Sequence, residues 1–266
     1  MAGGSRIGAR KEMPEDWEKV AKMLERFKIH SLVLIGGFQA YRAALTMLDL
    51  RLKHKSFCIP ICVLPATISN NVPGSSFSVG SDTALNEICA TIEKIKQSAT
   101  GTRRRVFIVE VMGGYCGYLA TLAALASGAD NAYIFEEKFS LDNIREDVRV
   151  IAEKMLTGNQ RYLITRCEKA NENYTADFIT KLFTEEGAGL FETKSNTLGH
   201  HQQGGTPSPF DRIHGIKLAV RAIEWLVPIC NASMTGDDVV YTTKPDTVCV
   251  IGLLQRQIAF TPVADL

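Results

Sequence analysis

Five polar segments are the parts of this chain whose residue types could do chemistry. Four of them combine glycines with hydroxyl, amide or imidazole side chains, and the fourth along the chain carries charged side chains. Glycine lets backbone N–H groups approach a ligand closely, and a following helix N-terminus favours negative charge, so the segments suit an anion such as phosphate. They are Gly36-Gly37-Phe38-Gln39-Ala40, residues 65–74, Met112-Gly113-Gly114-Tyr115-Cys116-Gly117, Arg166-Cys167-Glu168-Lys169 and residues 198–205.

Carboxylates are scarce in these segments. Glu168 is the only one, apart from Glu110 in a predicted strand. Phosphoryl transfer from ATP needs acidic groups that hold magnesium, and usually another that orients or deprotonates the attacking hydroxyl. The residue types therefore favour binding of a polar anion over catalysis, and we expect neither catalytic nor metal-ligating residues here.

Each motif also has a purely structural interpretation. Paired glycines such as Gly36-Gly37 and Gly204-Gly205 are commonly turns. The pair His200-His201 could be ordinary histidines, and Arg103-Arg104-Arg105 a solvated basic cluster. The functional interpretation rests on position, because the candidate segments follow successive predicted strands.

Alternating helices and strands would position these segments. Continuous apolar strands separated by helices indicate a doubly wound α/β fold, with a mostly parallel sheet covered by helices on both faces. In such sheets ligands bind outside the carboxyl ends of the strands. We expect helices at 17–27, 38–52, 81–97, 118–127, 141–156, 174–186 and 211–226, and strands at 29–35, 58–64, 106–111, 132–135, 162–166 and 248–253.

Composition narrows the class of protein. The 266 residues form an ordinary globular chain, expected as a single domain over 1–266, with a smaller lobe at 134–191 as an alternative division. A net charge of +1 gives no attraction to nucleic acid or to a membrane. The seven scattered cysteines favour reduced structural thiols over a zinc site. With no signal peptide or apolar span apparent, we expect a cytoplasmic protein.

Three motifs carry a family resemblance. Residues 65–71 (PATISNN), 109–117 (VEVMGGYCG) and 198–205 (LGHHQQGG), the last followed by PSPFDR at 207–212, closely resemble 6-phosphofructokinase. The Gly-Gly-Tyr-Cys and Gln-Gln-Gly-Gly versions resemble the C-terminal half of the duplicated eukaryotic ATP-dependent enzyme. Compared with a family half, the chain is expected to lack the first strand and the C-terminal tail.

Departures from the family pattern fall on the acids of the catalytic halves. Phe38 and Ala40 stand where those halves have a magnesium-associated acid and a hydroxyl. Ser69 and Asn71 stand where they have aspartates, one of which accepts the proton of the sugar hydroxyl. Two arginines of the family correspond to Gly114 and Gln203. The resemblance therefore implies a half whose catalytic acids are replaced.

The residues that correspond to the family's sugar-phosphate-binding residues depart less from the family pattern. Lys194 replaces the usual arginine, which keeps the charge but loses the bidentate fork. The resemblance puts Arg105 on an arginine that reaches across a dimer interface, so that it would serve a neighbouring subunit. We expect Arg105, Lys194 and His200 to grip phosphates while Ser69, Asn71 and Glu168 hold sugar hydroxyls. The implied ligand-binding residues are Arg10, Thr67, Ile68, Ser69, Asn70, Asn71, Arg105, Met112, Gly113, Gly114, Glu168, Lys194, His200, His201, Gln202 and Gln203.

The resemblance implies a function for this half. It would bind fructose 2,6-bisphosphate as an allosteric activator, beside an N-terminal catalytic half, in a homo-oligomer that is a tetramer in the complete enzyme. The complete enzyme would use ATP and Mg²⁺ to phosphorylate fructose 6-phosphate in glycolysis, whereas this half would need no cofactor and, as a segment on its own, would not be a phosphotransferase.

Three rival interpretations remain. One is a catalytically competent phosphofructokinase domain, and another is a purely structural subunit. The third is a dinucleotide-binding oxidoreductase, because Gly114 and Gly117 follow a strand and Glu136 lies about twenty residues further on. That fingerprint requires a first glycine where this sequence has Met112.

Overall fold

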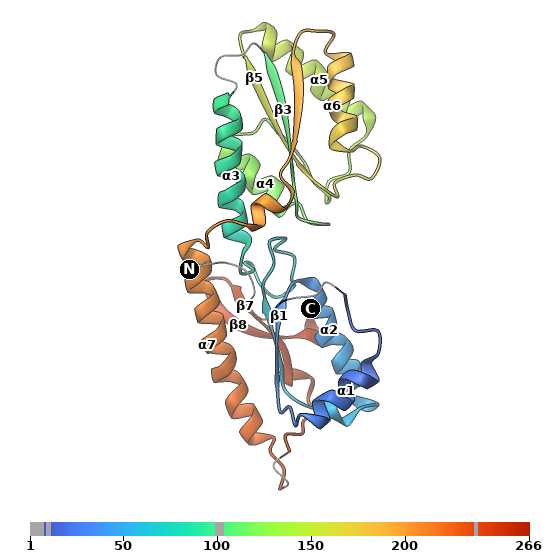
Figure 1. Ribbon diagram of the computed structural model, residues 1–266, viewed down its shortest axis with the longest axis vertical. Helices are drawn as coiled ribbons and strands as arrows, with labels where there is room; N and C mark the ends of the chain where they lie inside the picture. Colours follow the sequence, from blue (N-terminus) through green and yellow to red (C-terminus); the bar gives the residue numbers. More distant parts are fainter. Residues whose placement is uncertain (1–7, 9–11, 99–103, 237–238) are drawn as a thin grey trace. The chain divides into compact units, whose positions relative to one another are not determined.

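Two compact units make up the structure, a computed structural model that describes residues 8, 12–98, 104–236 and 239–266 (Figure 1). The middle unit is Ser81–Ser208. The terminal unit combines the described residues up to Gly80 with those from Pro209 onward, so two distant parts of the chain build it. Each unit has its own four-stranded sheet.

The middle unit contains an all-parallel sheet in the order β4-β5-β3-β6. Helices α3 and α4 cover one face and α5 and α6 the other (Figure 1). In the register, Glu110 lies between Arg166 on one neighbouring strand and Thr197 on the other, so three strand ends meet at one edge. The elements are α3 (Ser81–Ser98), β3 (Arg105–Val111), α4 (Tyr118–Ser127), β4 (Asn131–Tyr133), α5 (Leu141–Leu156), β5 (Arg161–Cys167), α6 (Ala176–Glu186), β6 (Glu192–Thr197) and the 3-10 turn η3 (Gly199–Gln203).

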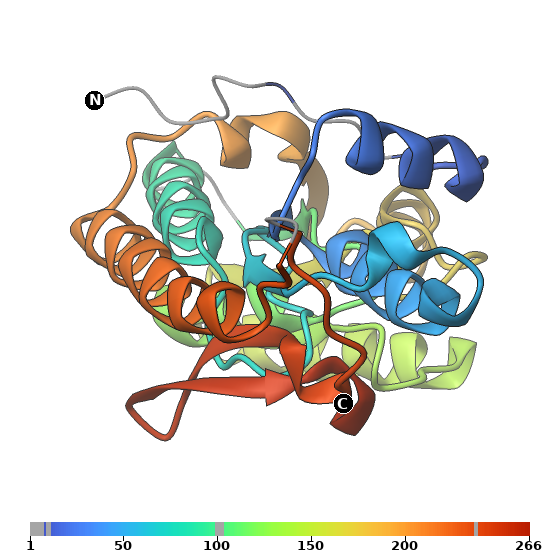
Figure 2. The same ribbon diagram turned by 90° about the horizontal axis from the view of Figure 1, so that it is seen from below.

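The terminal unit contains a mixed sheet in the order β1-β2-β7-β8, in which β8 alone is antiparallel to its neighbour. Side chains of β2 alternate between two apolar clusters: Ile61 and Val63 pack toward α1 and α2, and Cys62 and Leu64 toward α7. Figure 2 shows α1 and α2 on one side of this sheet and α7 on the other. The elements are α1 (Trp17–Arg26), β1 (Leu32–Gly36), α2 (Phe38–Asp49), β2 (Ile61–Pro65), α7 (Pro209–Ala232), β7 (Val248–Leu254) and β8 (Gln257–Pro262), with 3-10 turns at Leu50–Leu52, Lys55–Phe57, Pro245–Thr247 and Val263–Asp265.

Local sequence signals explain several helix ends. Asp16 caps α1, since its carboxylate accepts a hydrogen bond from the Lys19 N–H at 2.9 Å. Ser140 and Asn143 form a reciprocal capping box at the start of α5. Gly128 ends α4 in the left-handed conformation, with φ of 62°, which glycine adopts without steric cost. These caps fix the helices that cover the sheets.

The expected α/β class is confirmed, with mostly parallel strands and helices on both faces. The sheet organisation differs from the expectation, because the strands form two sheets rather than one. The alternative lobe at 134–191 corresponds to only part of the middle unit, which is Ser81–Ser208.

Two strands were not predicted. β6 has the sequence ETKSNT and is an edge strand with mostly half-buried or exposed residues, so it lacks the apolar signal of a strand. β8 is the antiparallel edge of the other sheet. Two predicted strands began too early, since Ile29 N–H bonds to Leu24 O in the turn after α1 and Cys58 N–H bonds to Lys55 O at the end of a 3-10 turn.

Candidate functional site

The loop after β3 holds the carboxylate of Glu168. Its Oε1 accepts hydrogen bonds from the N–H of Gly114 at 2.9 Å and, more weakly, from the N–H of Gly113 at 3.3 Å. Both glycines are required by geometry. Gly114 has φ of +59°, and a Cβ on Gly113 would lie 2.8 Å from Cys116 O. The predicted site residues Gly113, Gly114 and Glu168 therefore do come together.

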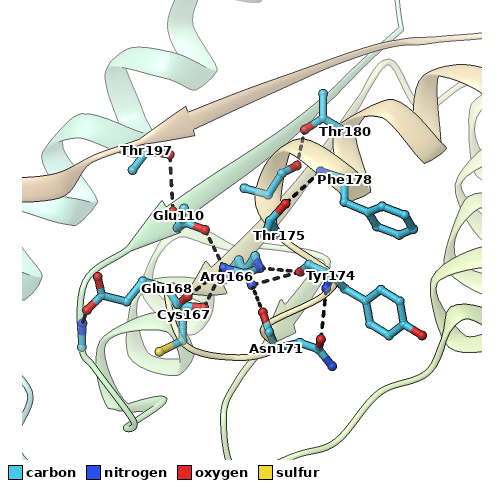
Figure 3. Close-up of polar contacts among 12 residues, drawn as sticks. Glu110, Arg166, Cys167, Glu168, Asn171, Tyr174, Thr175, Phe178, Thr180 and Thr197 are labelled. Carbon is cyan, nitrogen blue, oxygen red and sulfur yellow. Dashed lines mark hydrogen bonds and ion pairs between the residues drawn. The ribbon is translucent and has the colours of Figure 1, made fainter.

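Arg166 fixes the segment that carries Glu168 (Figure 3). Its side chain is 1% exposed, and its guanidinium donates to Glu110 Oε2 at 2.5 Å. Further bonds go to the backbone oxygens of Asn171 at 2.8 Å and Tyr174 at 2.9 Å, and to those of Cys167 and Glu168. A buried arginine needs a charge partner and satisfied donors, and this one has both. It thus ties β5, β3 and the 168–174 loop into one rigid piece.

Cys167 closes the other side of the same loop. Its thiol donates toward Gly114 O at 3.1 Å, and Cys116 O lies at 3.4 Å. Burial raises the pKa of the Cys167 thiol, so it stays protonated and can donate. The thiol is a structural donor, as expected for the cysteines of this chain.

Gln202 joins η3 to the end of β3. Its Oε1 accepts the Met112 N–H at 3.0 Å, and its Nε2 donates to Met112 O at 3.2 Å. The Gln202 side chain is buried, so this pair of hydrogen bonds holds the two segments together. The neighbouring His200, His201 and Gln203 are exposed, with His200 Nδ1 3.3 Å from Gln203 Oε1. Met112 and Gln202 form the scaffold of this edge, and the two histidines face solvent.

Arg105 and Lys194 lie elsewhere in the middle unit. Both are ion-paired with Glu192, Arg105 at 3.2 Å and Lys194 at 2.7 Å. Arg105 begins β3, whereas Met112 follows its end, which puts them about 20 Å apart at about 3.3 Å per residue. The structure therefore does not bring Arg105 together with Glu168 inside one chain. The hydrogen bond from Lys194 is the main cause that lowers the pKa of Glu192.

The terminal unit carries the other predicted loop, after β2. Thr67 Oγ1 accepts the Ser69 N–H at 3.2 Å, which shapes a turn. Asn70 is in the left-handed region, with φ of 52°, and its amide donates to Ser76 O at 2.9 Å and accepts the Ser78 N–H at 2.7 Å. Asn70, predicted as a ligand-binding residue, thus has both ends of its side chain engaged in holding the loop. Ile68 and Ser69 are half-buried and Asn71 is exposed.

The glycine turn after β1 lies against this loop. A Cβ on Gly37 would be 3.1 Å from Thr67 Cβ, and the Ala66 N–H bonds to Gly36 O at 2.9 Å. Phe38 follows at the start of α2, with its ring 5.8 Å from that of Tyr41. The two loops of the terminal unit are therefore neighbours. Arg10, the remaining predicted residue, lies outside the described residues.

The carboxylate of Glu136 occupies the N-terminal end of α4, at Gly117. The Gly117 N–H donates to both carboxylate oxygens of Glu136, at 2.8 and 2.9 Å. A Cβ on Gly117 would lie 2.6 Å from Glu136 Oε2 and from Ile134 Cβ. In a dinucleotide-binding fold the pyrophosphate would take this place at the helix N-terminus. Here the acid proposed for the ribose sits there instead, which speaks against the oxidoreductase interpretation.

Arg166 is the residue of this site that the sequence analysis missed. The available signal was an arginine at the end of an apolar strand, because arginine is rarely buried unless it is paired. Within the described ranges, no group of three or more His, Cys, Asp or Glu side chains is placed to hold a metal ion. Nor does any described helix have the length and apolar character needed to cross a membrane.

Comparisons with known proteins agree on one family. A family model described as phosphofructokinase matches residues 1–226. An ATP-dependent 6-phosphofructokinase of Haemonchus contortus is 55% identical over 269 residues, covering 100% of this chain and 34% of that protein. The muscle-type ATP-dependent 6-phosphofructokinase of Homo sapiens is 50% identical over 265 residues, covering 99% of this chain and 34% of that protein.

A solved structure gives the same result. Phosphofructokinase from Saccharomyces cerevisiae superimposes with a TM-score of 0.92 at 33% sequence identity, covering 100% of this chain and 36% of that one. The chain therefore spans about a third of the length of the relatives that it matches.

Proposed function

Because the chain belongs to the phosphofructokinase family, we propose that it is the C-terminal half of an ATP-dependent 6-phosphofructokinase and binds fructose 2,6-bisphosphate without transferring phosphate. The complete enzyme would phosphorylate fructose 6-phosphate with ATP and Mg²⁺ in glycolysis. This half would regulate that reaction from a site descended from a catalytic one.

The observation that carries the proposal is that the acids expected from the resemblance are replaced, whereas the carboxylate expected to hold the sugar is present. In the terminal unit, the loops after β1 and β2 present Phe38, Ser69 and Asn71 at positions where the resemblance expects acids. In the middle unit, Glu168 is kept and held at Gly113 and Gly114. Loss of a catalytic base commonly lowers a rate by about 10² to 10⁴, whereas a sugar needs only hydrogen-bonding groups. The groups that remain suit recognition.

Arg105 and Lys194 would supply the phosphate contacts for a neighbouring subunit. Arg105 lies about 20 Å along β3 from the Glu168 loop, too far for one small sugar bisphosphate to touch both, and it shares Glu192 with Lys194. A second copy of the chain would bring such a cluster to the site of its partner. Binding should then strengthen as the protein associates.

A pair of measurements tests the proposal. Calorimetric titration of the chain with fructose 2,6-bisphosphate, and separately with fructose 6-phosphate and ATP, should show a preference for the bisphosphate. A coupled assay with Mg²⁺, ATP and fructose 6-phosphate should show no turnover. Turnover at ordinary kinase rates of about 1 to 100 per second would identify a competent catalytic domain instead. Equal affinity for the two sugars would reject the regulatory role.

Glu168→Gln ties the result to the site. A hydrogen bond to a charged group contributes about 1.5 to 3 kcal/mol, so affinity should fall by about 10- to 150-fold. The matched control is Glu172→Gln, the same change at an exposed position four residues further on, which should leave affinity unchanged. Equal losses in the two variants would show that Glu168 does not contact the ligand.

A further inference from the structure

The loop after β2 depends on other parts of the terminal unit for its shape. Residues 66–80 contain no helix or strand, and one isolated β-bridge joins Ala66 to Val79. The first limb of the loop, residues 67–71, carries Ser69 and Asn71, which the proposed function assigns to sugar hydroxyls. Because no strand ladder fixes these two side chains, the contacts that anchor the loop determine where they lie.

Asn70 joins the first limb to the second limb, residues 75–80. Its amide donates to Ser76 O at 2.9 Å and its carbonyl accepts the Ser78 N–H at 2.7 Å. The side chain spans the loop from one limb to the other. A displacement of residues 76–78 therefore displaces Asn70, and with it the residues on either side, Ser69 and Asn71.

Two buried side chains of α7 hold the second limb. Asp211 and His214 are three residues apart, so they lie on the same face of the helix. Asp211 Oδ1 accepts the Gly80 N–H at 2.9 Å, and His214 Nε2 lies 3.2 Å from Phe77 O. A carbonyl oxygen can only accept, so Nε2 carries the hydrogen and donates it. Phe77 O also accepts from Ser75 Oγ at 2.7 Å, so loss of the His214 bond leaves that carbonyl with a partner.

Ring contacts orient the His214 imidazole toward the loop. It stacks on the Phe210 ring at 5.4 Å with 22° between the planes, and the Phe210 ring meets the Phe77 ring edge-on at 5.3 Å. His214 is 5% exposed and Asp211 is 4% exposed. Neither side chain is therefore placed to touch a ligand in solvent, and any influence on binding must pass through the loop.

We propose that His214 is a positioning residue for ligand binding in the terminal unit. Its hydrogen bond holds the second limb of the loop against α7, and Asn70 transmits that position to Ser69 and Asn71. The inference rests on the proposed function, since the property that His214 sets is the affinity for the sugar bisphosphate. It adds a residue that lies more than a hundred positions from the loop in the sequence and has no contact with the ligand.

A matched pair of variants tests the proposal. His214→Leu removes the donor, whereas His214→Gln keeps an N–H at a similar distance from the backbone. Loss of one neutral hydrogen bond should make amide hydrogen exchange in the second limb of the free chain about 2- to 10-fold faster in His214→Leu, and should weaken bisphosphate affinity in calorimetry by the same factor. His214→Gln should restore most of both. The control is Leu226→Ala, a buried change about three turns further along α7, which should lower stability in urea and leave affinity unchanged.

A double-mutant cycle with Ser69→Ala separates positioning from a merely structural role. If His214 acts through the loop, His214→Leu should cost less affinity in the Ser69→Ala background than in the original chain. Unchanged exchange in the second limb, unchanged affinity in His214→Leu, or an equal loss in both backgrounds would each overturn the inference. Absence of binding by the original chain would reject the proposed function and the effect on affinity together, whereas the exchange measurement would still decide whether His214 holds the loop.

Discussion

At the carboxyl end of β3 an arginine is buried and bonded to backbone oxygens, whereas near its amino end the charged side chains are half-buried or exposed and paired with each other. Arg166 is 1% exposed and makes its contacts with Glu110 and four backbone oxygens. Arg105 and Lys194 share Glu192, whose side chain is half exposed. The charges near the two ends of β3 therefore have different physical roles.

The comparison distinguishes side chains that hold the loops of a site in place from side chains that are available to bind a ligand. A buried network has one arrangement, because any other would leave a charge or a donor without a partner. An exposed ion pair contributes little to stability, and its members can exchange partners when an anion arrives. The same residue type, arginine, is thus a scaffold at one end of β3 and a candidate ligand-binding group at the other.

The largest effect should come from Arg166→Leu. Removing this side chain leaves Glu110 as an uncompensated charge and four carbonyl oxygens without their donor, so the free energy of unfolding should fall by about 3 to 5 kcal/mol. Urea denaturation would measure it. Arg105→Ala is the contrasting control and should lower stability by at most about 1 kcal/mol. Equal losses would remove the distinction between the two ends.

Arg105→Ala and Lys194→Ala should act on binding instead. Loss of a charge-assisted contact should weaken the affinity for fructose 2,6-bisphosphate by about 10- to 150-fold, corresponding to about 1.5 to 3 kcal/mol. Calorimetry at two salt concentrations would also show a shallower salt dependence in Lys194→Ala, because one fewer cation is screened. The control is Arg149→Ala, an arginine paired within α5. If Lys194→Ala binds like the original chain, the cation cluster is not the phosphate site.

Ser69→Ala should have a smaller effect on the same affinity. A neutral hydroxyl exchanges its hydrogen bond with water, so its removal should cost about 0.5 to 1.5 kcal/mol of binding free energy. The Thr67 hydroxyl that shapes the turn accepts from the Ser69 backbone and would be unaffected. Titration of the variant would measure the loss. A loss as large as that of Arg105→Ala would mean that Ser69 also shapes the loop.

Glu192→Gln should have the smallest effect and the opposite sign. It removes the acid that neutralises Arg105 and Lys194, so affinity for the bisphosphate should rise slightly. The folded-state pKa of Glu192 is lowered, chiefly by Lys194. The stability that its pairs contribute is therefore present above the unfolded-state pKa and lost as the pH falls through the folded-state value. Measurements of stability against pH should differ between the original chain and Glu192→Gln only in that pH window. A weaker affinity of Glu192→Gln for the bisphosphate would contradict the proposed role of Arg105 and Lys194.

The parts of the fold that sequence could predict are those with strong local signals. Helices 118–127 and 141–156 have the predicted bounds, because α4 ends at a left-handed glycine and α5 begins at a capping box. β6 was missed since its polar residues lie at a sheet edge. The split into two sheets depends on which strands pair, and no local pattern records that.

The site shows the same limit. The glycines after β3 were predicted to bring backbone N–H groups to a ligand, and in the structure the N–H groups of Gly113 and Gly114 bond to Glu168 of the same chain. The role of Asn70 could not be read from its residue type, because its amide serves the loop through residues six and eight positions away. The separation of Arg105 from Glu168 follows from strand length, which becomes visible only when both strand ends are known.

The pairing of β2 with β7 also sets an order of events during synthesis. The middle unit is one continuous segment and can fold as soon as it leaves the ribosome. β2 must wait for a partner about 180 residues further along the chain, which at about 5 to 20 residues per second takes about 10 to 35 seconds. During that time the edge of β2 that later pairs with β7 stays unpaired and can pair with another chain. The terminal unit therefore completes its sheet only after the whole middle unit has been made.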